Sequence, residues 1–278
     1  SWSGPRIGLS AADLNADKSE VIGWLSQQSA RTLFAGAGLN YDDQLAAAAK
    51  PGFRALPLGD LNATITLSNS LRKSSSNNVI GIIPGATRPN ETIIYSSHWD
   101  HLGINPAVEG DNIYNGAQDN ASGTAALLSL ARLFKSLPQN PERTVVFLSV
   151  TAEESGLLGS QWYAENPVFP LETTVANINM DGLPVFGPMR DMVVVGYGNS
   201  ELEDYLRKAL VHQKGRYLAP EPHPERGSYY RSDHLNFARH GVPALYAKSG
   251  EDSLDNGLEW GARQTQDYTD TRYHSPLD

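Results

Sequence analysis

The stretch that decides the fold is Val145-Val146-Phe147-Leu148-Ser149-Val150-Thr151-Ala152-Glu153-Glu154-Ser155-Gly156. Its first half is an almost continuous apolar run, which is typical of a central strand covered on both faces. Glu153 and Glu154 follow where this strand would end, and open α/β sheets build their sites at the carboxyl ends of strands. One glutamate could therefore hold a metal ion while its neighbour moves a proton.

Two other apolar runs end in side chains that bind metals. Ile93-Ile94-Tyr95-Ser96-Ser97 leads to His98, and Ala176-Asn177-Ile178-Asn179-Met180 leads to Asp181. If these runs and 145–150 are parallel strands of one sheet, the residues that follow them meet at one edge. The sequence therefore predicts a shared crevice at that edge.

The candidate metal ligands outnumber the needs of one ion. Asp119 precedes a helix pattern at 121–134, and His274 lies near the end of the sequence. A catalytic zinc takes three protein ligands of the His or carboxylate type and keeps one position for water. Two ions bridged by a carboxylate, most naturally Asp119, would use the whole set: His98, Asp119, Glu154, Asp181 and His274.

Neighbouring residues suit supporting roles. Asp100 could orient the first histidine by accepting a hydrogen bond from its other ring nitrogen. Glu153 is left as the general base that takes a proton from water and passes it to the leaving amine. Tyr273 could donate a hydrogen bond to the developing oxyanion, and Arg231, beside two tyrosines, could contact the substrate. The remaining histidines are expected to be structural or surface residues: His101, His212, His223, His234 and His240.

The composition excludes several functions. The chain has 278 residues, 40% of them hydrophobic and 19% charged, as in an ordinary globular protein. A net charge of −9 without a Lys/Arg cluster argues against nucleic acid and anionic membranes as partners. The absence of cysteine excludes disulfides and thiolate chemistry, and no apolar run is long enough for a membrane span. Because the sequence starts without Met, we expect a processed or trimmed N-terminus.

The chain divides softly near Pro51. Before this point, residues 5–9 predict an extended start, Ser10 begins a helix that continues through Leu25, and 41–50 suits a helix or a linker. After it, strand patterns dominate. We therefore expect an N-terminal segment at 1–50 and a larger domain at 51–278.

Strand patterns occur at 63–67, 78–83 and 92–95. The turn-forming residues of 84–91 favour an antiparallel hairpin between the last two, so the sheet should be mixed. The helix at 121–134 is apolar almost all round, as expected for one packed deep against a sheet. Two further strands with a helix between them complete the prediction: 192–196, 242–247 and, for the helix, 201–212.

Short motifs in a fixed order resemble those of the M28 family of zinc metallopeptidases, of the type that carries a protease-associated domain. They cover the chain from about Asn78 to its end: His98-Trp99-Asp100, Asp119 to Gly123, Glu153 to Ser160, Asn179-Met180-Asp181, Ser232 to Ala244 and Tyr273-His274-Ser275. The resemblance implies an α/β zinc exopeptidase fold, with a doubly wound, mixed and mostly parallel sheet flanked by helices.

The resemblance also implies a site with two zinc ions per chain. It assigns the ligands as two pairs and a bridge: His98 with Asp181, Glu154 with His274, and Asp119 between them. Glu153 is the implied base, and a cis peptide bond is implied after Asp119, where Asn120 stands in place of a frequent Asp. The segment 1–50 is interpreted as a possible remnant of a protease-associated domain plus a linker.

The implied activity is that of a secreted or periplasmic aminopeptidase, which removes N-terminal residues from peptide substrates through a metal-bridging hydroxide. Carboxypeptidase or dipeptidase activity stays open, because loops outside the metal core select the terminus. Glutaminyl cyclisation, on a related fold with one zinc, is a further alternative. A non-catalytic module is disfavoured, because such relatives lose ligands that this chain keeps. The preferred cleavage residue and the oligomeric state are not predicted.

Overall fold

The computed structural model describes residues 7–10, 23–213 and 215–278. The described residues of 10–74 form one compact unit, and 75–278 together with 7–9 form another. The main segment of the second unit begins at Ser75. The division predicted near Pro51 and the assignment of 1–50 to a domain remnant stay predictions. Within the described ranges, no helix combines the length and apolarity needed to cross a bilayer.

The first unit contains two short helices, α1 (Gln27–Gly36) and α2 (Tyr41–Ala48). Ser26 and Asn40 cap them by accepting hydrogen bonds from backbone N–H groups of the first turn. Neither helix has a buried residue. The two helices therefore have little apolar packing. Of the alternatives left open for 41–50, a helix or a linker, the structure shows a helix over Tyr41–Ala48.

Three predictions for the first 74 residues are wrong or lie partly outside the described residues. Residues 63–67 form no strand, so that prediction is wrong; Ile65 and Leu67 are both 58% exposed. Alternating residues become a strand only when a partner strand supplies ladder bonds and side-chain packing. The helix predicted from Ser10 lies mostly outside the described residues, and 23–25 are not helical. The predicted extended start is described only at 7–9, where there is no strand.

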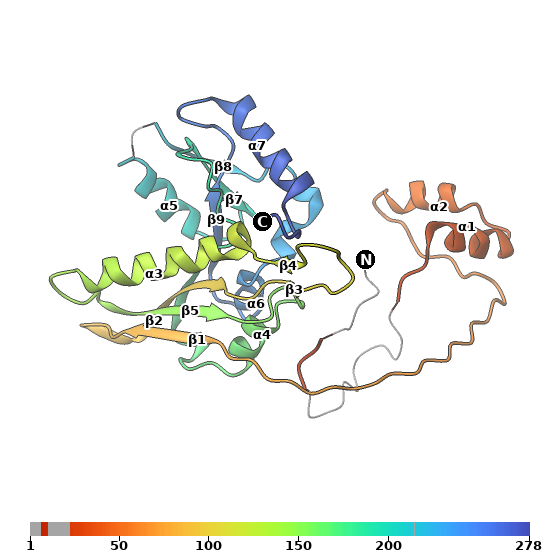
Figure 1. The fold of residues 1–278 in the computed structure, drawn as a ribbon, viewed down its shortest axis with the longest axis horizontal. Helices are drawn as coiled ribbons and strands as arrows, with labels where there is room; N and C mark the ends of the chain where they lie inside the picture. The colour runs from red at the N-terminus through yellow and green to blue at the C-terminus, as the bar shows by residue number, and fades with distance from the viewer. Residues whose placement is uncertain (1–6, 11–22, 214) are drawn as a thin grey trace. The chain divides into compact units, whose positions relative to one another are not determined.

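A seven-stranded sheet forms the centre of the second unit (Figure 1). Four neighbouring strands, β5, β2, β6 and β9, run parallel to one another, whereas β1 pairs antiparallel with β5, and β7 pairs antiparallel with β9 and parallel with β8. The predicted mixed, mostly parallel sheet is confirmed. In spatial order the strands are β1 (Val79–Ile83), β5 (Arg143–Val150), β2 (Arg88–His98), β6 (Thr174–Asn179), β9 (Ala244–Ser249), β7 (Asp191–Val195) and β8 (Tyr217–Pro220).

The predicted hairpin between β1 and β2 is wrong, because β5 lies between these strands. The connecting loop crosses the start of β5: the N–H of Gly85 donates to Oγ1 of Thr144, and the N–H of Ala86 donates to the carbonyl of Pro141. The apolar β5 needs a neighbour on each side, whereas the largely exposed β1 suits an edge. The turn residues therefore indicate a reversal of direction but not a pairing.

Helices cover both faces of the sheet (Figure 1). On one face, Val145 and Phe147 of β5 pack in a cluster with Leu127 of α3 (Ser122–Lys135). On the other, Val146 and Leu148 pack with side chains of α4 (Leu158–Glu165) and α6 (His234–Arg239). This alternation confirms that 145–150 is a strand buried on both sides. The helices α5 (Leu202–Leu210) and α7 (Leu258–Thr271) and the small hairpin of β3 (Gly103–Ile104) and β4 (Ile113–Tyr114) complete the unit.

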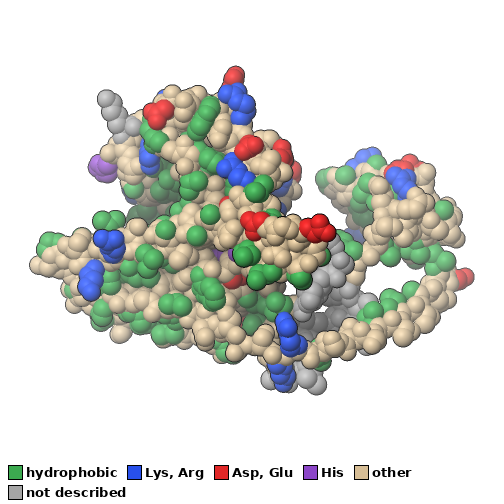
Figure 2. Space-filling view, in the orientation of Figure 1, with side chains coloured by type: hydrophobic (Ala, Val, Ile, Leu, Met, Phe, Trp, Pro, Cys, Tyr) green, Lys and Arg blue, Asp and Glu red, His purple; other side chains and the backbone are tan. Residues whose placement is uncertain are grey.

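The helix α3 is less deeply buried than its composition predicts. Leu127 is 4% exposed, whereas Leu128 and Leu133 are 64% and 63% exposed. Figure 2 shows separate hydrophobic side chains on the surface in this part of the molecule, interrupted by polar groups. Only one side of α3 therefore packs against the sheet.

Candidate metal centre

Parallel strand ends bring the predicted residues together. His98 ends β2 and lies in register with Val150 at the end of β5, and the N–H of Met180 after β6 donates to the carbonyl of Ser96. The next residue, Asp181, has its Oδ1 3.2 Å from Nε2 of His98. The convergence expected from three parallel strands is thus present in the structure.

Asp119 enters the site from a short turn, η1 (Ala117–Ala121), that precedes α3. The implied cis peptide bond between Asp119 and Asn120 is present. The Asn120 side chain donates to the carbonyl of Met180 and accepts from the N–H of Gly123. These bonds tie the turn both to the residue before Asp181 and to the start of α3.

Asp119 lies between two histidines. Its Oδ1 is 3.1 Å from Nε2 of His98, and its Oδ2 is 3.3 Å from Nε2 of His274. Nε2 of His274 is also 3.2 Å from Oε2 of Glu154. The structure therefore forms two groups that share Asp119, one with His98 and Asp181 and the other with His274 and Glu154.

The donor set fits zinc ions. With zinc–nitrogen and zinc–oxygen bonds of about 2.0–2.1 Å, two ligand atoms on one tetrahedral ion lie roughly 3.3 Å apart. The nitrogen–oxygen separations of 3.1 to 3.3 Å within the two groups match this value. Asp119, Asp181 and Glu153 are each less than a tenth exposed, and positive charge nearby would stabilise such a concentration of buried carboxylates.

The pKa values reflect this concentration of negative charge. Burial lowers the pKa of His98, but contacts with Asp119 and Asp181 outweigh it and raise the pKa far above its usual range. Burial likewise lowers the pKa of His274, and contacts with Asp119 and Glu154 raise it to about 9. Burial raises the pKa of Glu153 to about 10, with further contributions from neighbouring carboxylates. The protein alone thus attracts protons where a metal ion would supply positive charge.

Glu153 and Asp100 are directly linked, in a way that differs from the predicted role of Asp100. The ring Nδ1 of His98 lies 3.0 Å from the backbone carbonyl oxygen of Asp100 but 3.8 Å from its carboxylate. The carboxylate instead accepts the N–H of Glu153 at 3.1 Å. Asp100 therefore holds the histidine with its backbone and the predicted base with its side chain.

Tyr273 and Arg231 lie at the more open side of the site. The Tyr273 ring stacks on His274, with 3.9 Å between ring centroids. Burial and the charge of Asp119 raise the pKa of Tyr273, and the positive charge of Arg231 opposes them. Arg231 is exposed and close enough to influence this hydroxyl group electrostatically.

Two positioning contacts were missed in the sequence. Ser232 donates to Oδ2 of Asp181 at 2.5 Å and accepts from the Asn179 amide at 2.7 Å. The carboxylate of Asp278 accepts the N–H groups of Gln118 and Asp119 at 3.0 and 3.1 Å. Ser232 lies in a recognised motif that suggested only packing, and no pattern in the sequence singles out Asp278.

The histidines set aside in the sequence fall into three groups. His212, His223 and His240 lie at the surface, as expected. His234 is fully buried between Tyr229 and Tyr246, and burial lowers its pKa to about 4. His101 is different: its side chain is only 6% exposed and contacts Glu154.

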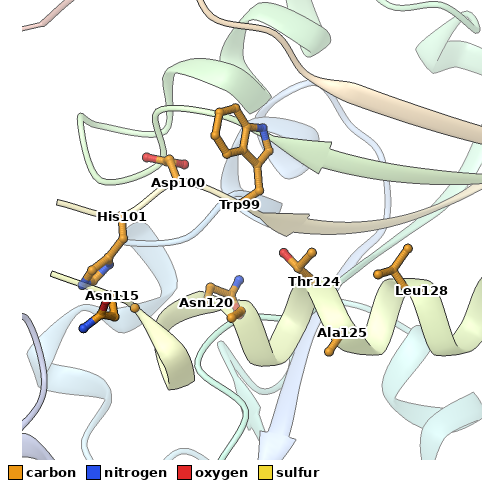
Figure 3. Close-up of a pocket in the computed structure, with 10 residues that line it drawn as sticks. Trp99, Asp100, His101, Asn115, Asn120, Thr124, Ala125 and Leu128 are labelled. Carbon is orange, nitrogen blue, oxygen red and sulfur yellow. The ribbon is translucent and has the colours of Figure 1, made fainter. Parts of the chain in front are cut away.

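A cavity of about 280 Å³ adjoins the site (Figure 3). It lies between α3, which contributes Thr124, Ala125 and Leu128, and the loop after β2. His101 and Asn115 lie at the opposite end of this cavity from Leu128 (Figure 3). The loop that carries His101 therefore borders a partly apolar cavity.

Comparisons with known proteins agree with the geometry. Aminopeptidase NAALADL1 of Mus musculus is 37% identical over 139 residues, 47% of this chain and 17% of that protein. A probable glutamate carboxypeptidase of Arthroderma benhamiae is 31% identical over 175 residues, 57% of this chain and 22% of that protein. The chain thus matches less than a quarter of the length of either relative.

Two broader comparisons concern the fold and the family. The structure of BSAP, a zinc aminopeptidase from Bacillus subtilis, has a similar fold, with a TM-score of 0.50 and 24% identity over 68% of this chain and 47% of that chain. A model of peptidase family M28 matches residues 78–278. This match takes in the sheet, its flanking helices and the histidine–carboxylate cluster, and the chain therefore belongs to peptidase family M28.

Proposed function

We propose that this chain is a di-zinc exopeptidase that removes N-terminal residues from peptides. The observation that carries the proposal is the position of Asp119, whose two carboxylate oxygens face His98 and His274. His98 and Asp181 would hold one zinc, His274 and Glu154 the other, and Asp119 would bridge them. The family resemblance supports a secreted or periplasmic location as part of the same proposal.

Activation of the attacking water and proton transfer to the leaving amine each have a candidate group. Bound zinc would supply Lewis acidity and lower the pKa of water so that it can attack a peptide carbonyl. Glu153 would take the proton of the attacking water on a carboxylate oxygen and pass it to the leaving amine nitrogen. The carboxylate of Glu153 lies within 4.8 Å of the ligand atoms of His98 and Asp181, which supports this role.

Tyr273 and Arg231 are the proposed substrate contacts. The raised pKa of Tyr273 keeps its hydroxyl protonated, so that it can donate to the oxyanion that develops on the carbonyl oxygen. Arg231 is exposed, its positive charge acts on Tyr273, and it suits the backbone or a terminus of a peptide. These two residues would orient the substrate relative to the metal ligands.

Carboxypeptidase activity is the second candidate. One relative is named a probable glutamate carboxypeptidase, and an exposed arginine at the site suits a terminal carboxylate. The same ligands and the same base would serve this reaction. The two candidates therefore differ in which end of the peptide is bound.

Mass spectrometry of cleaved peptides separates the candidates. Zinc-loaded protein is incubated with a short peptide that starts with an apolar residue, with its N-acetylated twin, and with the free peptide after treatment with EDTA. Loss of N-terminal residues from the free peptide alone, abolished by EDTA, is the expected result. Shortening of the acetylated twin from its C-terminus would show a carboxypeptidase. Cleavage of neither peptide would contradict both candidates.

The role of Glu153 has a separate test. Glu153→Gln keeps the shape of the side chain and removes the base, so kcat should fall about 10²- to 10⁴-fold. Both zinc ions should stay bound, as measured by elemental analysis of the purified protein. Glu172→Gln, which changes an exposed glutamate of a surface turn, is the matched control and should leave kcat unchanged. Wild-type activity in Glu153→Gln would exclude this residue as the base.

A further inference from the structure

His101 lies in the site although it is not among the predicted ligands. It follows Asp100 in the loop after β2, and its side chain is 6% exposed. Its Nδ1 lies 2.7 Å from Oε1 of Glu154. This contact is a close nitrogen–oxygen approach without the alignment of a hydrogen bond, and neither ring nitrogen has an aligned hydrogen bond with the described residues. The contact with Glu154 is thus the polar interaction that accounts for a buried imidazole.

The backbone is shaped to hold this ring. Gly116, just before the turn that carries Asp119, has φ +66, and a Cβ atom there would lie 2.6 Å from Cγ of His101. The same atom would lie 2.5 Å from the carbonyl oxygen of Asp119. His101 therefore packs against bare backbone, in a space that any other residue at 116 would fill. Figure 3 shows its ring beside Asn115, at one end of the cavity.

Two roles are possible for His101: a further metal ligand, or a residue that positions a ligand. A ligand role is sterically open, because donor atoms of His101, Asp119 and Glu154 all lie within 4.8 Å of one another. The distances favour positioning. Co-ligands of one tetrahedral zinc lie roughly 3.3 Å apart, whereas Nδ1 of His101 lies 2.7 Å from Oε1 of Glu154, which is a direct charged contact and shorter than the separation of two co-ligands.

The two oxygens of Glu154 also face different histidines. Oε2 is 3.2 Å from Nε2 of His274, on the side of Asp119, and Oε1 is the atom that His101 contacts. A carboxylate with one oxygen held in this way presents the other in a defined direction. Partners of this kind orient metal ligands and typically change metal affinity by about 10- to 100-fold.

We propose that His101 is a positioning residue of the metal centre: its Nδ1 holds Oε1 of Glu154, so that Oε2 is presented to the ion shared with His274. The role rests on the proposed di-zinc site. It gives the two zinc positions unequal dependence on one side chain, because His101 contacts Glu154 and not Asp181.

Zinc titrations of the full chain test the proposal, with a competing chelator to measure each dissociation constant. His101→Leu removes the donor, and one zinc dissociation constant should rise about 10- to 100-fold while the other stays unchanged. His101→Asn keeps an N–H group near the position of Nδ1 and should recover part of the lost affinity. His223→Leu, at an exposed histidine, is the control and should bind zinc like the wild type. If His101→Leu does not fold, His101→Asn and the spectroscopy below carry the test.

A second measurement separates positioning from ligation. In the cobalt-substituted wild type, the exchangeable ring N–H protons of coordinated histidines give separate, strongly shifted proton NMR signals. Two such signals, for His98 and His274, are expected in the wild type and in His101→Asn. Three signals in the wild type, with one lost in His101→Asn, would make His101 a ligand and overturn the proposal. Unchanged zinc affinity in both His101 variants would also overturn it, whereas a wild type that binds no zinc would overturn the di-zinc function itself.

Discussion

The two halves of the metal centre are built differently. His98 is the last residue of β2 and is 1% exposed, and its partner Asp181 follows β6. His274 lies after α7, its side chain is 35% exposed, and its backbone has φ +56. The backbone carbonyl of Asp100 holds His98, and Ser232 holds Asp181. The first half is thus anchored in the sheet.

In the second half Glu154 follows β5, but His274 is not at a strand end and depends on contacts of the C-terminal segment. Tyr273 stacks on His274, and Asp278 bonds to the backbone of the turn that carries Asp119. A few specific contacts therefore position His274, whereas His98 and Asp181 are positioned by the ends of β2 and β6. The difference indicates that substitutions should affect the two halves unequally, and only a change in the shared residue should affect both.

The largest effect is expected for Asp119→Ala, because Asp119 belongs to both halves. Affinity for both zinc ions should fall by more than roughly 100-fold, which is the upper end of the loss expected when a residue that only orients a ligand is replaced. Peptidase activity should be lost with it. Zinc titration and peptide cleavage measure the two effects. Retention of one zinc at wild-type affinity would show that the halves do not share this carboxylate.

The next prediction contrasts His98→Ala with His274→Ala in chelated protein. Loss of His98 leaves Asp119 and Asp181 buried without their common cation, and breaking such a pair costs about 3–5 kcal/mol. Loss of His274 should cost clearly less, because that side chain is more exposed. Urea denaturation in the presence of EDTA measures both free energies of unfolding. Equal losses would contradict the distinction between an anchored half and a loop-supported half.

A smaller loss is expected for Asp278→Ala. It removes a charged acceptor of two backbone N–H groups, and hydrogen bonds to charged groups contribute about 1.5–3 kcal/mol each. The loss should be near one such bond, because water can reach part of the turn. Asp255→Ala, at an exposed position, is the control for denaturation measurements. An unchanged free energy of unfolding would show that Asp278 does not hold the Asp119 turn.

The smallest effect concerns the pH dependence of chelated protein. The pKa of His274 is raised from 6.5 to about 9 in the folded state, so protonation stabilises the fold. This contribution is complete below pH 6.5 and is lost as the pH rises through about 9. Thermal denaturation with EDTA should therefore give a falling Tm across this window. Glu153 contributes with the same sign, so the test is a comparison: His274→Gln should show a shallower decline, and an identical decline would contradict the assignment.

Much of the fold follows from local patterns. The apolar run 145–150 is a central strand because both of its faces are covered, and three such runs place their trailing residues at one edge. The hydrophobic pattern of a strand does not determine which other strand pairs with it. Residues 78–83 and 92–95 have the composition of a hairpin, yet β5 lies between them. Residues 63–67 alternate between apolar and polar side chains as a strand does, but they form none. Alternation gives a segment one apolar face and does not supply the partner strand that it needs.

The candidate site divides in the same way. The types and order of His98, Asp119, Glu154, Asp181 and His274 could be read from the sequence, because metal ligands come from few residue types. Their supporting contacts could not. Asp100 uses its backbone where its side chain was expected, and Ser232, Asp278 and His101 carry no distinguishing pattern.

The sequence by itself thus determined the family, the class of fold and the set of candidate ligands, since these depend on residue type and on periodicity along the chain. The tertiary structure alone decided which strands are neighbours, which oxygen of each carboxylate faces which histidine, and that His101 contacts Glu154. The physical reason is that the two kinds of information act over different distances along the chain. Periodicity reflects the burial of a face, whereas hydrogen bonds and metal ligation depend on ångström-scale directions that only the packing of distant segments sets.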